Sequence, residues 1–120
     1  MRPWVRDGLL VLVLTCLGGC SAAESERQAL MREKYPSYPE HIRKAIDSGT
    51  LVKGMTQEQV LLAIGRTPCV NSRSLKGKTY DSWAYKLDPA TGKLIVPERC
   101  QAGRQAVVFE NGYLMEWDAQ

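Results

Sequence analysis

The chain has 120 residues, of which 44% are hydrophobic and 24% are charged, with 16 Lys and Arg residues against 13 Asp and Glu residues. This composition is typical of one small globular domain with an added segment, and it argues against two domains. The formal net charge is only +3, and no basic cluster is interleaved with aromatic residues, so the sequence excludes an electrostatic footprint for nucleic acid.

The most hydrophobic stretch lies at the start of the chain. Eight of the nine residues from Leu9 to Leu17 are apolar, and Arg2 and Arg6 precede them. A run of this length is too short to cross a bilayer, which needs about 20 residues, but it matches the core of a signal peptide. We therefore expect residues 1–19 to be a signal peptide.

A cysteine motif, Leu17-Gly18-Gly19-Cys20, closes this run and resembles a bacterial lipobox. The resemblance implies cleavage before Cys20, lipid on its thiol and amine, and an anchor that needs no membrane-spanning helix. Ser21 stands where inner-membrane lipoproteins commonly carry Asp, so the resemblance implies an outer-membrane protein at the periplasmic face. The alternative is an ordinary secretory signal in which Cys20 is incidental.

Removal of the signal peptide changes both the charge and the cysteine count. Residues 1–19 hold two basic residues and one acidic residue, so the net charge falls from +3 to +2. Cys16 leaves with the signal and Cys20 carries lipid, which leaves Cys69 and Cys100. Two cysteines in an exported protein most simply form one disulfide, and the absence of a Cys-x-x-Cys motif makes a redox role the weaker alternative.

The segment after the lipobox has few apolar residues. Residues 21–34 are rich in Ala, Glu, Gln and Arg, and Leu30 and Met31 are their only large apolar side chains. A transient helix there would have little to bury, and two prolines follow within four residues. We interpret residues 20–39 as the lipidated cysteine with a tether, and residues 40–120 as the folded domain.

Two short helices are predicted at the start of this domain. Glu40–Ser48 carries apolar residues at positions i, i+3 and i+4, and Gly49 follows as a stop signal. The second helix, Gln57–Ile64, begins after the N-cap residue Thr56, with Gln59 completing a capping box. A helix this short is not stable alone, so we expect it to pack against a sheet.

Three strands complete the predicted domain. Thr79–Leu87 alternates apolar and polar residues, and Asp88–Gly92 has the composition of a turn. The strands Gln105–Glu110 and Tyr113–Trp117 flank Asn111-Gly112. This dipeptide is the strongest short hairpin signal, because both central positions of a type I′ turn need positive φ.

The two-residue loop also predicts the register of this hairpin. Phe109 should face Leu114 and Val108 should face Met115, which puts Trp117 on the same face as Val108. One face of the sheet would cover the helices, and the other would be left as an apolar surface suited to a partner. The long connection before the hairpin could instead fold back over that surface, and both alternatives stay open.

Taken together, these features resemble the SmpA/OmlA (BamE-like) outer-membrane lipoproteins. The resemblance covers residues 42–117, and its most specific part is the helix start Gly54-Met55-Thr56. It implies an α+β fold in which two short helices pack on a three-stranded antiparallel sheet. It also implies a non-enzymatic protein with a partner in envelope maintenance, including the assembly of β-barrel proteins in the outer membrane.

No catalytic, cofactor or metal site is predicted. His41 and the two cysteines lack a fourth metal ligand, and the carboxylates Asp81, Glu110 and Glu116 are scattered over strands. There is no glycine-rich phosphate loop. Two hypotheses remain, namely a binding module of the cell envelope, and a periplasmic inhibitor or ligand-binding lipoprotein that caps another protein.

Overall fold

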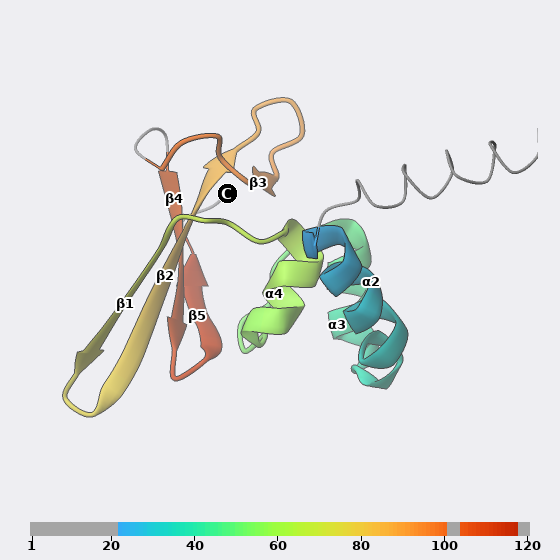
Figure 1. Cartoon of the computed structure of the whole chain (residues 1–120), viewed down its shortest axis with the longest axis horizontal. Coiled ribbons are helices and arrows are strands. Elements are labelled where there is room, and N and C mark those ends of the chain that lie inside the picture. The colour runs from blue at the N-terminus through green and yellow to red at the C-terminus, as the bar shows by residue number, and fades with distance from the viewer. Residues whose placement is uncertain (1–21, 101–103, 118–120) are drawn as a thin grey trace, which may run out of the picture.

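Helices precede an antiparallel sheet in the computed structural model, which describes residues 22–100 and 104–117 (Figure 1). The helical elements are α2 (Ala22–Glu33), the 3₁₀ turn η1 (Tyr35–Ser37), α3 (Glu40–Ser48) and α4 (Gln57–Ile64). The strands are β1 (Val70–Leu75), β2 (Lys78–Leu87), β3 (Leu94–Ile95), β4 (Arg104–Glu110) and β5 (Tyr113–Trp117). The α+β class is as predicted, but the prediction of two helices and three strands omitted α2, β1 and β3.

The sheet lies on one side of the molecule and the helices lie on the other. Its strand order is β1-β2-β4-β5, and β3 pairs with the end of β2 beyond β1. Every pairing in the sheet is antiparallel. Figure 1 shows α4 next to the sheet, with α2 and α3 on the far side of α4. One face of the sheet is therefore covered by helices, and we call the opposite face the outer face.

Helices α3 and α4 have the bounds that the sequence predicts. In the capping box, the Thr56 hydroxyl accepts a hydrogen bond from the Gln59 backbone at 3.2 Å, and the Gln59 side chain accepts one from the Thr56 backbone at 3.0 Å. Gly49 ends α3 with a left-handed φ of 71°. These helices were predictable because capping groups and a glycine stop are local signals.

Helix α2 corrects the interpretation of its segment as a tether. Leu30 and Met31 pack against the core. Arg27 donates to a backbone carbonyl of α4 at 3.2 Å, and Arg66 pairs with Glu26 through contacts of 2.7 and 3.3 Å. The composition offered little to bury, but contacts with α4 stabilise the helix, as tertiary packing does for most short helices.

The core fills the space between the helices and the sheet. Trp83 and Phe109, on adjacent strands, place their ring centroids 4.7 Å apart. Gly54 N donates to Leu114 O, and Leu114 N donates to Met55 O, each at 2.8 Å, so the residues before α4 pair with β5. The buried apolar residues of this core are Ile42, Ala45, Ile46, Met55, Val60, Leu61, Leu62, Trp83, Tyr85, Leu94, Val107, Phe109 and Leu114.

The β4–β5 hairpin has the predicted turn but only part of the predicted register. Asn111 and Gly112 both have positive φ, as expected. A bulge beside Phe109 then makes Val108 pair with Glu116 instead of Met115. The extra residue turns Trp117 to the helix-facing side, where it packs against the core. The prediction that placed Trp117 with Val108 is therefore wrong, because a shift of one residue reverses the face of later side chains.

Tyr85 joins the sheet to the end of α4 by a buried hydrogen bond. Its side chain is fully buried, and its hydroxyl donates to Gly65 O at 2.6 Å. Burial raises the pKa of Tyr85 above its ordinary value of 10.0, because the phenolate would lose its hydration. The charge of the nearby Arg66 acts in the opposite direction but does not outweigh burial.

The buried hydroxyl of Tyr85 predicts how the stability of the protein changes at alkaline pH. Tyr85 ionises near pH 10.0 in the unfolded chain but remains neutral there in the folded protein. Its contribution to stability is therefore complete below that pH and is lost as the pH rises further. Tyr85→Phe should cost about 1–3 kcal/mol at neutral pH, since the Gly65 carbonyl loses its donor. It should also make the alkaline decline shallower than that of the wild type.

Urea unfolding of the wild type and the Tyr85→Phe variant, from about pH 8 to about pH 11, measures both effects. The difference between the two proteins below the pH at which Tyr85 ionises serves as the control, because there it reflects only the lost hydrogen bond. Parallel curves for the two proteins across the whole range would contradict the assignment.

Candidate functional site

The predicted lipid-attachment residue, Cys20, lies outside the described residues, as does the predicted signal peptide over residues 1–19. Helix α2 begins at Ala22, two positions after Cys20. None of the helices among residues 22–100 and 104–117 has the length and apolar composition that a membrane span requires. Because Cys20 is not among the described residues, the lipid anchor stays a prediction from the sequence motif.

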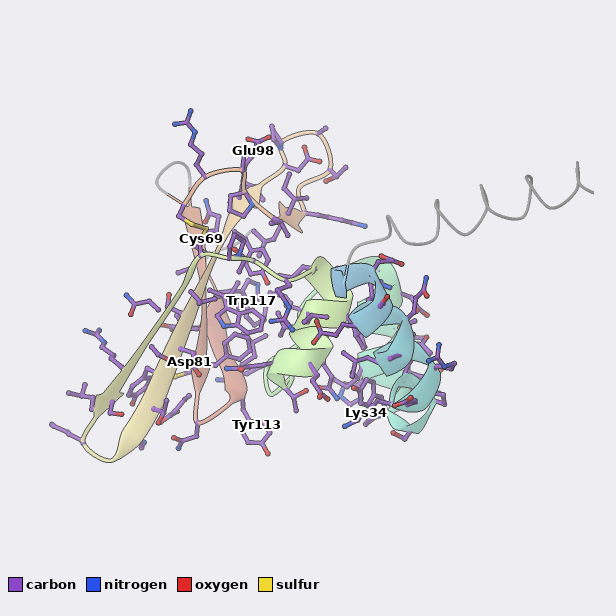
Figure 2. The ribbon with its side chains drawn as sticks, in the orientation of Figure 1. Lys34, Cys69, Asp81, Glu98, Tyr113 and Trp117 are labelled. Atoms are coloured by element: carbon purple, nitrogen blue, oxygen red, sulfur yellow. A yellow bond between two sulfur atoms is a disulfide. The ribbon has the colours of Figure 1, made fainter. Side chains whose placement is uncertain are left out.

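Cys69 and Cys100 form a disulfide, which is the pairing expected from the cysteine count. Figure 2 shows it where β1 begins, beside the segment that follows β3. Cys69 O also accepts a hydrogen bond from Ala84 N at 2.9 Å, so one end of β1 is fixed both covalently and to β2. The bond thus positions the edge strand of the sheet.

The side chains that were considered for metal binding or catalysis do not converge. His41 is exposed on α3, on the helical side of the molecule. Asp81 accepts hydrogen bonds from Gln57 and Ser72 and so connects α4 with two strands. No group of three or more His, Cys, Asp or Glu side chains suited to a metal ion occurs among residues 22–100 and 104–117.

The carboxylate Glu110 has a structural partner near the hairpin ends. It lies 2.8 Å from Lys78, and this hydrogen bond lowers the pKa of Glu110 and raises the pKa of Lys78. Since both groups are held in their charged forms, Glu110 is poorly suited to proton transfer near neutral pH.

In the part of the chain that the structure describes, the outer face of the sheet is hollowed rather than covered. Beside β1 it contains a hollow of about 510 Å³, and a second hollow of about 460 Å³ continues toward the disulfide. Small side chains at Ser82, Ala84 and Ala106 leave this space open. The lining of the larger hollow is Asn71, Arg73, Leu75, Tyr80, Asp81, Ser82, Val108, Met115 and Glu116.

The connection after β2 does not close these hollows where it is described. Strand β3 pairs edge to edge with β2, and Leu94 is buried in the core. Val96 approaches Gly65, at the end of α4. Of the two alternatives for this face, the described part of the connection therefore follows the edge and the helix side.

Strand β1 is the part of this surface that the sequence did not predict. All six of its residues are exposed, including Val70 at 58% and Leu75 at 54%. Because it buries no side chain, it lacks the apolar alternation that identified the other long strands. The available signal was Lys76-Gly77, which forms a two-residue turn with positive φ at both positions, as Asn111-Gly112 does.

In the described residues, these features form a partly apolar surface that is open to solvent. It consists of the hollowed outer face and the exposed edge strand β1, with the disulfide at one end. No family model, curated protein or solved structure matches the chain.

Proposed function

We propose that the protein is a non-enzymatic binding module of the cell envelope. In this proposal lipid on Cys20 holds it at the periplasmic face of the outer membrane, and its sheet binds a protein partner. The observation that carries the proposal is the pairing of a lipobox-like motif with a domain whose sheet, as far as the chain is described, has an uncovered face and edge. Open surfaces of this kind on small domains commonly bind partners.

The position of α2 supports a domain held close to the membrane. Two extended residues span at most about 7 Å, so a lipid on Cys20 would lie near the start of α2. The ion pair between Arg66 and Glu26, with the packing of Leu30 and Met31, fixes α2 to the domain. An anchor at this site would therefore restrain the domain instead of leaving it on a long tether.

The SmpA/OmlA (BamE-like) resemblance supplies the more specific part of the proposal. It suggests a two-layer domain of helices on an antiparallel sheet, with a role in outer-membrane maintenance that includes β-barrel assembly. Helices α3 and α4, the capping box and the closing hairpin stand in the order that this resemblance implies.

Anchoring is tested by replacing Cys20 with alanine in the full chain. We expect the wild-type protein to fractionate with outer membranes and to incorporate labelled palmitate, whereas Cys20→Ala should be soluble in the periplasm or remain unprocessed. Cys16→Ala is the matched control, since that residue would leave with the signal peptide. A processed Cys20→Ala protein still held on the membrane would refute lipid anchoring.

Partner binding is tested by affinity purification of the tagged protein from solubilised outer membranes. Recovery of barrel-assembly components would support the assembly role. Recovery of a soluble hydrolase alone would favour the alternative, a periplasmic inhibitor or ligand-binding lipoprotein that caps another protein. The Cys20→Ala protein serves as the comparison, because it retains the domain while losing the proposed anchor.

A further inference from the structure

We infer that β1 binds an extended segment of a partner protein that carries an acidic side chain, and that this segment adds a strand to the sheet. The inference deepens the proposed binding function and rests on it, because it names the surface and the form of the partner. Figure 1 shows β1 at the side of the sheet away from the helices, where a further strand could lie alongside it.

The backbone of β1 is arranged to accept such a strand. Leu75 and Lys78 flank the two-residue turn, and Ala84 N donates to Cys69 O. Since hydrogen-bonded and non-hydrogen-bonded pairs alternate in antiparallel strands, the backbone groups of Ser72 and Ser74 face away from β2. An exposed row of such groups is a template for another strand.

The opposite edge of the sheet differs in this respect. Leu114 of β5 already exchanges backbone hydrogen bonds with Gly54 and Met55, and the β4–β5 pair contains a bulge. In contrast, the six residues of β1 pair with β2 without a register shift, and none is proline. Bulges, prolines and covering segments are the usual protections of an edge strand, so β1 is left free to pair as far as residues 22–100 and 104–117 show.

Charge on this edge indicates what the partner carries. Residues 70–78 contain Arg73, Lys76 and Lys78 and no acidic residue. Lys78 pairs with Glu110, whereas Arg73 and Lys76 take part in none of the ion pairs among the described residues. Opposite charges on neighbouring strands attract, which favours an acidic side chain beside Arg73.

The outer face of the sheet also indicates which second side chain the partner segment should carry. Side chains of a strand return to one face at every second position, so a residue two places from the acidic one would lie beside Leu75. Leu75 is half exposed and borders the hollow of about 510 Å³ with Tyr80 and Met115. The partner segment should therefore combine an acidic residue with an apolar residue two positions away.

Selection of a random peptide library displayed on phage, against the full mature chain, tests this inference. The decisive comparison is Ser74→Pro against Ser74→Ala. Proline removes an N–H that faces away from β2, a position where edge strands tolerate it, and alanine keeps that N–H. The selected peptides should bind Ser74→Pro about tenfold more weakly than wild type, and Ser74→Ala within about twofold.

A charge reversal tests the chemistry of the partner separately. The selected peptides should be enriched in an acidic residue with an apolar residue two positions away. They should bind the Arg73→Glu variant about tenfold more weakly than the wild type. The same variant should gain affinity for peptides in which the acidic residue is replaced by lysine. Thermal unfolding of each variant confirms that the domain is folded.

Three results of the peptide selection would overturn the inference. These are equal affinity for Ser74→Pro and Ser74→Ala, selected peptides that are indifferent to Arg73→Glu, and no selected peptide at all. A dimer in sedimentation experiments that Ser74→Pro dissociates would also overturn it, because the occupant would then be a second copy of the chain. Peptide binding needs no lipid, so failure here is distinct from retention of Cys20→Ala on the membrane, which contradicts the proposed anchoring alone.

Discussion

Replacing Cys69 and Cys100 together with serine should lower the free energy of unfolding by about 3–4 kcal/mol. The two residues are 31 positions apart in the sequence, so their bond restricts a long loop in the unfolded chain. The folded part is a small domain with a limited core, for which such a loss is a large share of the total stability. Urea denaturation of the oxidised wild type and the double variant measures the difference.

Reduction of the wild type provides the matched control for this prediction. Reduced wild type and the double variant lack the same cross-link, so their midpoints should agree, although their side chains at the two positions differ. A loss below about 1 kcal/mol would contradict the chain-entropy argument. Because Cys69 precedes β1 directly, peptide binding to the double variant would also show whether the cross-link positions the proposed binding edge.

The elements that the sequence predicted with correct bounds are those with local signals. Helix α4 is specified by Thr56 and Gln59, which satisfy each other's backbone and side-chain groups within four residues. Helix α3 is specified by its apolar spacing and by Gly49. The Asn111-Gly112 turn likewise depends on the conformations available to two adjacent residues.

The elements that the sequence missed depend on contacts between distant segments. Helix α2 is stabilised by packing on α4, and by an ion pair between Glu26 and Arg66, 40 positions apart. The bulge beside Phe109 cannot be read from a turn that is otherwise ideal, yet it decides the face of Trp117. These features follow from tertiary packing, which local composition does not encode.

The candidate site was predictable only in part for the same reason. The sequence indicated that one sheet face would be left without helices, since both faces of the β4–β5 hairpin carry apolar residues. It did not indicate β1, whose sequence from Val70 to Leu75 has no buried position. An exposed edge strand is specified by its turn and by the strand with which it pairs, so hydrophobic periodicity is a poor guide to it.

Replacing Phe109 with alanine should reduce the free energy of unfolding by about 3–5 kcal/mol, because it removes a fully buried aromatic ring. The ring contacts Trp83 and belongs to the buried core between the sheet and the helices. Its neighbour Val108 points to the outer face, where it lines the hollow and is only partly buried. Val108→Ala should therefore cost less than about 1 kcal/mol.

Urea denaturation of both variants gives the two losses in the free energy of unfolding. Their ratio shows which face of β4 packs in the core. Both variants shorten a side chain on the same strand, so differences in strand propensity are small compared with the effect of burial. Similar losses for Phe109→Ala and Val108→Ala would mean that the outer face is covered in solution as well. That result would contradict the open face on which partner binding depends, whereas a large difference leaves the outer face and β1 available to a partner.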